Sequence, residues 1–153
     1  MNKQSPLVQT VLINGGILIM LRVFVEVLFI TFQGEEILFD RSKIEMPLVE
    51  MGLAIAMMIY AGYKFRDTNG YTITLQEGFL IMVGVYALGS LGAALFQILW
   101  VYFLNPATQA LVPTPDWYSP TNFMNSFFTS VLFGSVLALV FSLILSRRKA
   151  KIS

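Results

Sequence analysis

Four long apolar runs constrain the fold of this chain more than any other feature of its sequence. A helix needs about 20 mainly apolar residues to cross the roughly 30 Å hydrocarbon core of a bilayer. Hydrophobic residues make up 56% of the 153 residues and charged residues only 12%, whereas soluble domains carry about 25% charged residues. The runs predict membrane spans at approximately residues 7–32, 47–63, 78–103 and 123–145.

Each run is predicted to be helical, because a helix pairs its own backbone N–H and C=O groups inside lipid. A β-barrel would instead require alternating segments of about ten residues, and the sequence has none. We therefore predict an all-α fold, an integral membrane four-helix bundle in which residues 1–153 form a single domain.

The chain contains no cysteine and no histidine. This composition excludes disulfides, thiolate or histidine metal sites, a cysteine nucleophile and a histidine-based catalytic triad. We expect no metal, no cofactor and no enzymatic activity. The net charge of +1 gives no reason to expect nucleic acid as a partner.

The distribution of lysine and arginine predicts the orientation of the spans, because cytoplasmic segments carry more of both. One side would carry only Arg41 and Lys43. The other side would carry both chain ends and most basic residues: Lys3, Lys64, Arg66, Arg147, Arg148, Lys149 and Lys151. Both termini are therefore predicted to be cytoplasmic. The basic tail at residues 147–151 is interpreted as a positive-inside anchor, and contact with anionic lipid is the alternative.

Three charged residues interrupt the apolar runs. Arg22 lies near the middle of the first run, and Glu26 follows four residues later on the same helical face. At 1.5 Å per residue, Glu26 lies ~6 Å outward of Arg22. Glu50 in the second run and Gln97 in the third reach about the same level. These four residues form a predicted intramembrane charge layer.

Charges at membrane depth face protein or water and have partners, because insertion into lipid costs at least ~2.5–3.5 kcal/mol. Three hypotheses for the charge layer remain open. Arg22 and an acid could form a structural ion pair that orders the bundle. The layer could bind a subunit, a lipid or a cofactor. It could also carry protons or ions through a transporter, because two carboxyls share a single guanidinium.

Small residues recur every four positions in the fourth run. Such spacing lets another helix approach closely. Gly52 and Ala56 repeat the spacing in the second run. The stripe predicts packing within the bundle or against another subunit, and its members are Ser126, Ser130, Gly134, Ala138 and Ser142.

One stretch resembles a known family. The segment from Tyr63 through Arg66, Asp67 and Asn69-Gly70-Tyr71 is followed by Glu77, an apolar run and Asn105-Pro106. It resembles a family of small four-span bacterial inner-membrane proteins classed as a domain of unknown function. The resemblance implies four helices and a bacterial plasma membrane, and it transfers no catalytic residue.

These observations predict a small multi-span protein that acts as an accessory, assembly or structural subunit of a larger membrane complex. Its expected partners are the bilayer and other membrane subunits or further copies of itself. The alternative is a small oligomeric proton- or ion-coupled transporter or channel, which would use the layer of Arg22, Glu26 and Glu50.

Overall fold

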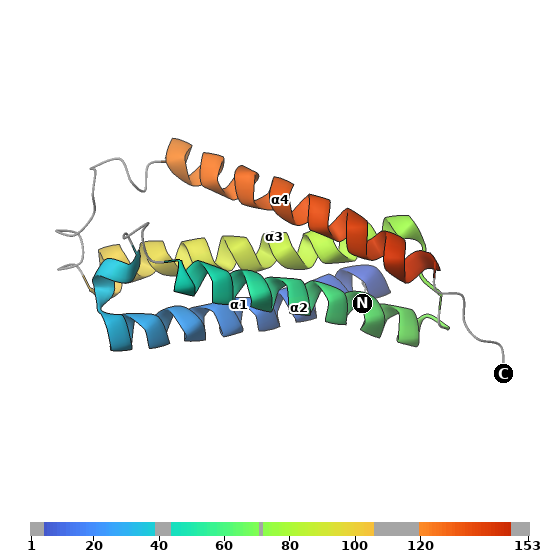
Figure 1. Ribbon diagram of the computed structural model, residues 1–153, viewed down its shortest axis with the longest axis horizontal. Helices are drawn as coiled ribbons and strands as arrows, with labels where there is room; N and C mark the ends of the chain where they lie inside the picture. The colour runs from blue at the N-terminus through green and yellow to red at the C-terminus, as the bar shows by residue number, and fades with distance from the viewer. Residues whose placement is uncertain (1–4, 39–43, 71, 106–119, 148–153) are drawn as a thin grey trace.

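The computed structural model describes residues 5–38, 44–70, 72–105 and 120–147 (Figure 1). Its four long helices are α1 (Pro6–Gln33), α2 (Glu45–Thr68), α3 (Leu75–Leu99) and α4 (Pro120–Arg147). A 3-10 helix, η1 (Glu35–Leu38), follows α1, and a π-helical turn, η2 (Trp100–Leu104), extends α3. All four long helices carry segments apolar enough to span a membrane. The all-α fold class and the four predicted apolar helices are confirmed.

The helix boundaries follow local chemistry. The Ser5 side chain accepts a hydrogen bond from the Val8 N–H, and Pro6 occupies the first turn of α1. Thr74 and Glu77 form a reciprocal capping box at the start of α3, as the sequence indicates. Helix α2 continues five residues beyond the predicted span because no helix breaker precedes Asn69, and Gly70 then adopts a φ of 66°.

Successive helices run in opposite directions, so Pro6 and Arg147 lie at the same end of the molecule (Figure 1). We call this the terminal end and the opposite one the η1 end. Such an arrangement agrees with four membrane crossings. The cytoplasmic position of the termini stays a prediction.

Helices α1, α2 and α3 share a core that includes Leu18, Met58 and Val85, all of them fully buried. Glycines bring α1 and α3 into close contact. A Cβ atom added at Gly89 would lie 2.4 Å from Leu18, and one added at Gly92 would lie 2.4 Å from Ile19. The absence of a side chain at these glycines therefore leaves the space in which α1 side chains pack against α3.

Helix α4 packs mainly on α3, with a smaller contact to α2. The two helices are close at the terminal end and diverge toward the η1 end (Figure 1). Gly134, Ala138 and Ser142 are buried, whereas Ser126 and Phe128 are exposed. The stripe on α4 thus serves packing within the molecule from Ser130, which contacts Tyr86 of α3, to Ser142.

Candidate functional site

The buried face of α1 repeats every four residues and contains polar groups. Asn14, Leu18, Arg22, Glu26 and Ile30 all lie on it and all are buried. Side chains four residues apart in a helix share one face. This face places a guanidinium and a carboxyl in the interior, between α1 and the two helices that pack on it, α2 and α3.

Arg22 is bound by residues of α3. Its side chain is 6% exposed, and Nη1 donates a hydrogen bond to Ser90 Oγ at 3.1 Å. Its Cζ lies 5.6 Å from the centre of the Tyr86 ring, within the range of a cation–π interaction. The guanidinium is therefore held by a hydroxyl and an aromatic face.

Glu26 is fully buried and bonds to α3 as well. Gln97 Nε2 donates to Glu26 Oε1 at 3.2 Å. This contact brings together two of the residues that the sequence assigned to one layer. The other carboxyl oxygen, Glu26 Oε2, is buried and has no hydrogen-bond partner.

Glu50 brings a second carboxyl to the same place from α2. Its side chain is half-buried, and its Oε1 is buried without a hydrogen-bond partner. The carboxyls of Glu26 and Glu50 are close enough to interact directly, and both interact electrostatically with Arg22. The structure thus places Arg22, Glu26, Glu50 and Gln97 in one cluster, which we call the polar layer.

The direct ion pair expected between Arg22 and an acid does not form. In the described part of the chain, no carboxylate oxygen lies within ion-pair distance of the Arg22 guanidinium. Arginine placed four residues before an acid is the less favourable order on a helix. Arg22 extends instead toward Ser90 and Tyr86 on α3.

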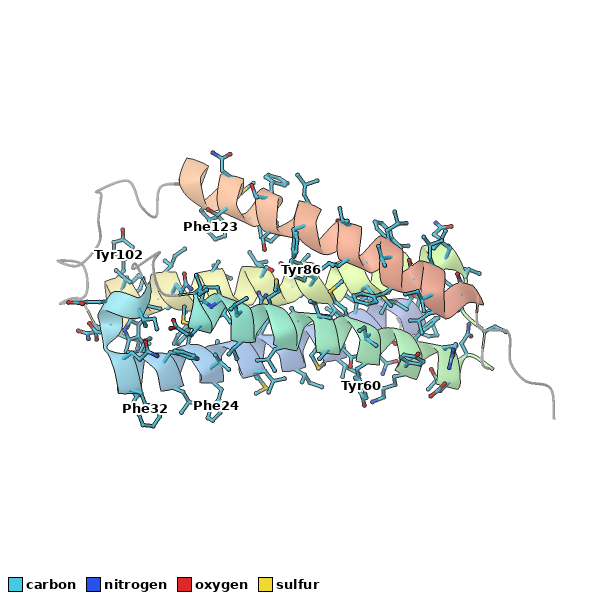
Figure 2. The ribbon with its side chains drawn as sticks, in the orientation of Figure 1. Phe24, Phe32, Tyr60, Tyr86, Tyr102 and Phe123 are labelled. Carbon is cyan, nitrogen blue, oxygen red and sulfur yellow. The ribbon has the colours of Figure 1, made fainter. Side chains whose placement is uncertain are left out.

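Tyr86, Ser90 and Asn14 are polar residues of the interior that sequence reasoning missed. Tyr86 connects the polar layer to α4, because its hydroxyl lies 3.1 Å from Ser130 Oγ and its ring fills the space beside Gly134. Figure 2 shows Tyr86 between α3 and α4, whereas Phe24 and Phe32 point away from the molecule. Polar residues inside an apolar run are the signal that marks Ser90 and Asn14.

Apolar side chains close the polar layer toward both ends. Ile30 and Met46 lie four residues from Glu26 and Glu50 on the η1 side, and Trp100 packs against the cluster that they form with Ile37. On the terminal side, Leu18 lies four residues from Arg22 and Ala54 four residues from Glu50, and both are fully buried. Apolar side chains therefore lie on both sides of the charged groups along the helix axes. Of the three charged side chains, only that of Glu50 is partly exposed.

The predicted basic tail lies mostly outside the described residues. Arg147 ends α4, and Arg148, Lys149 and Lys151 lie beyond the described part of the chain. The basic residues of α2 are described. Lys64 Nζ and Arg66 Cζ lie 5.6 and 4.9 Å from the ring centres of Tyr60 and Tyr63.

Comparison with known proteins adds no assignment to this geometry. No family model, curated protein or solved structure matches the chain. The resemblance to a four-span bacterial family therefore stays a prediction. Within the described residues, no three His, Cys, Asp or Glu side chains converge as metal ligands.

Proposed function

We propose that the chain is an accessory, assembly or structural subunit of a larger membrane complex, with both termini on the cytoplasmic side of a bacterial plasma membrane. The observation that carries this proposal is the divergence of the start of α4 from α3 (Figure 1). Ser126 and Thr129 are exposed there beside Phe128, which is 55% exposed.

Hydroxyl groups gain nothing from contact with hydrocarbon, whereas they stabilise helix–helix contacts in membranes. The small residues of α4 continue past the part that α3 covers, from buried Gly134 to exposed Ser126. A transmembrane helix of another subunit would extend the same mode of packing along the first half of α4.

Cysteine cross-linking tests this proposal directly, because the natural chain has no cysteine. Ser126→Cys should form cross-links in native membranes with a neighbouring subunit. Met20→Cys is the matched control, since Met20 is 75% exposed on a different helix. The mass of the product distinguishes a second copy from another protein, and purification in mild detergent gives the stoichiometry. Equally weak cross-linking of the Ser126→Cys and Met20→Cys variants would contradict the proposal.

Proton- or ion-coupled transport is the second candidate. It is favoured by the two carboxyls of Glu26 and Glu50, each of which has a buried oxygen without a hydrogen-bond partner. Ionisable groups that face a membrane protein's interior are common in proton and ion pathways. Purified protein in liposomes should then show proton- or ion-dependent uptake that Glu50→Gln reduces. Uptake unchanged by Glu50→Gln would contradict this candidate.

A further inference from the structure

The polar layer contains three buried polar atoms without a hydrogen-bond partner: Arg22 Nε, Glu26 Oε2 and Glu50 Oε1. Arg22 is 6% exposed and Glu26 is fully buried, so bulk water does not reach either group. Leaving such atoms unpaired costs about 1–3 kcal/mol each, and more where the group is charged. The polar layer as it stands is therefore incomplete.

The charges of the polar layer do not balance. One guanidinium and two carboxyls, in their ordinary charge states, leave a net charge of −1. The Arg22 guanidinium is directed at Ser90 and Tyr86 and forms no ion pair with either acid. Burial of an uncompensated charge in an apolar interior is very costly. One additional positive charge beside the carboxyls would balance the polar layer.

We propose that the polar layer binds one small monovalent cation between the carboxyl oxygens of Glu26 and Glu50, with the Gln97 side chain as a neutral ligand. Gln97 already contacts Glu26, and its amide nitrogen and oxygen exchange places by a 180° turn. A divalent ion would leave the polar layer with a net charge of +1. The cation is a proton or an alkali ion such as Na⁺, because the two share this chemistry of carboxyl oxygens around a single charge.

The surroundings favour a small ion over a larger ligand. The cluster of Ile30, Met46 and Trp100 lies on the η1 side of the carboxyls, and on the terminal side Ala54 follows Glu50 and Leu18 precedes Arg22 by one turn. Tyr86 is the titratable group that faces the polar layer from α3, and its hydroxyl is engaged with Ser130 of α4. Glu50 and Gln97, both half-buried, connect the polar layer to the surface.

Thermal stability and tryptophan fluorescence of the purified full-length chain test the proposal. Trp117→Phe leaves Trp100, which packs next to the polar layer, as the single reporter. If the cation is Na⁺, replacing choline chloride by saturating NaCl at fixed pH should raise Tm by about 5–10 °C and change the emission of Trp100. If the cation is a proton, both signals should follow pH and ignore Na⁺.

Glu26→Gln and Glu50→Gln should each abolish the cation-dependent change in Tm. Glu45→Gln is the matched control, because Glu45 is exposed at the start of the same helix as Glu50. A dependence on cations that survives in both layer variants would overturn the proposal. So would stability and emission of the parent chain that respond to neither Na⁺, K⁺ nor pH.

Carbodiimide labelling of the unmodified chain keeps the test valid if the variants fail to fold. A protonated carboxyl adds across a C=N bond of dicyclohexylcarbodiimide, its proton passes to nitrogen, and mass spectrometry locates the adduct. Labelling of Glu26 or Glu50 that Na⁺ suppresses at fixed pH identifies the alkali ion. Labelling that rises only as the pH falls identifies the proton. Labelling of neither residue, or labelling that responds to neither variable, would overturn the proposal.

The proposed cation site does not depend on the role of the chain as a subunit, and cross-linking at Ser126 tests that role separately. If the chain is a transporter, the site would bind the ion to which transport is coupled. Cation binding without uptake would leave the site standing and contradict transport. Uptake without cation binding at Glu26 and Glu50 would contradict the site.

Discussion

At the scale of single residues, the two charged groups that α1 contributes to the polar layer take their partners from a distant part of the sequence. Arg22 bonds to Ser90 and Glu26 to Gln97, so the buried face of α1 is matched by hydroxyl and amide groups on α3. Each of these two charged side chains is hydrogen-bonded to a neutral side chain and not to the other. Removing the charge of Arg22 and removing the charge of Glu26 should therefore change stability differently.

Replacing Arg22 by leucine should lower the free energy of unfolding by about 3–5 kcal/mol, because both carboxyls lose the electrostatic interaction with the guanidinium and Ser90 loses its donor. The double variant Arg22→Leu with Glu26→Leu should recover part of that loss, since a single half-buried carboxyl remains. Thermal unfolding in a mild detergent measures both. A double variant less stable than Arg22→Leu alone would show that Glu26 is stabilised by groups other than Arg22.

The contact between Tyr86 and Ser130 should be measurable on its own. Tyr86→Phe and Ser130→Ala each remove one partner of the 3.1 Å contact between α3 and α4. A double-mutant cycle should give a coupling energy of about 0.6 kcal/mol, the average for such bonds in membranes. Additive effects of the two substitutions would show that the hydroxyls do not bond in the membrane.

Sequence reasoning placed Arg22, Glu26, Glu50 and Gln97 at one level, because helical rise and the direction of each span fix height. It could not assign their partners. The direction of the Arg22 side chain depends on Ser90, which lies 68 residues further along the chain. Height follows from one helix alone, whereas contacts require knowing how two helices are rotated against each other.

At the scale of helices, glycines distinguish packed faces from open ones. A Cβ atom added at Gly134 would lie 2.4 Å from the Tyr86 ring, whereas one added at Gly52 would meet nothing within 4 Å. Gly52 and Ala56 are exposed, so the spacing they share with α4 does not serve packing within this molecule. Spacing alone identifies a stripe of small residues, and only the rotation of the helix determines what covers it.

Gly134→Leu should therefore separate α4 from α3 and lower stability by about 1–3 kcal/mol or more. Gly52→Leu is the matched control and should leave unfolding of the isolated chain unchanged. The comparison requires only thermal unfolding of both variants and the parent. Equal stability of the Gly134→Leu variant and the parent would mean that α4 does not pack on Tyr86 in the membrane.

Apolar length predicted the four helices, but not their ends or irregularities. Helix α2 extends through Lys64, Arg66 and Asp67, because charged residues outside the hydrocarbon do not stop a helix. The π-helical turn at Trp100–Leu104 has no marker in the sequence. Composition determines which segments can enter lipid, whereas backbone geometry depends on residues that flank them.

At the scale of the whole molecule, an even number of crossings brings both chain ends to one side. Pro6 and Arg147 lie together at the terminal end (Figure 1). Lys64 and Arg66, at the end of α2, also lie toward it, and each faces a tyrosine ring. Apart from Arg22 of the polar layer, the basic residues described in the structure lie at the end that the distribution of charge predicts to be cytoplasmic.

A reporter that is active only in the cytoplasm should be active when fused to Ser153. The same reporter inserted in the connection between α1 and α2, after Asp40, should be silent. Activity at Asp40 and silence at Ser153 would reverse the predicted orientation while leaving the number of crossings unchanged.

The position of Tyr86 has a mechanical consequence. Its ring packs against Gly134 of α4, the Arg22 Cζ lies 5.6 Å from the ring centre, and its hydroxyl lies 3.1 Å from Ser130 Oγ. Helix α4 lies close to α3 at the terminal end and diverges from it toward the η1 end (Figure 1). A change in the tilt of α4 against α3 would therefore strain the contacts of Tyr86 with Ser130 and Gly134, and with them the cation–π contact that helps to hold the Arg22 guanidinium.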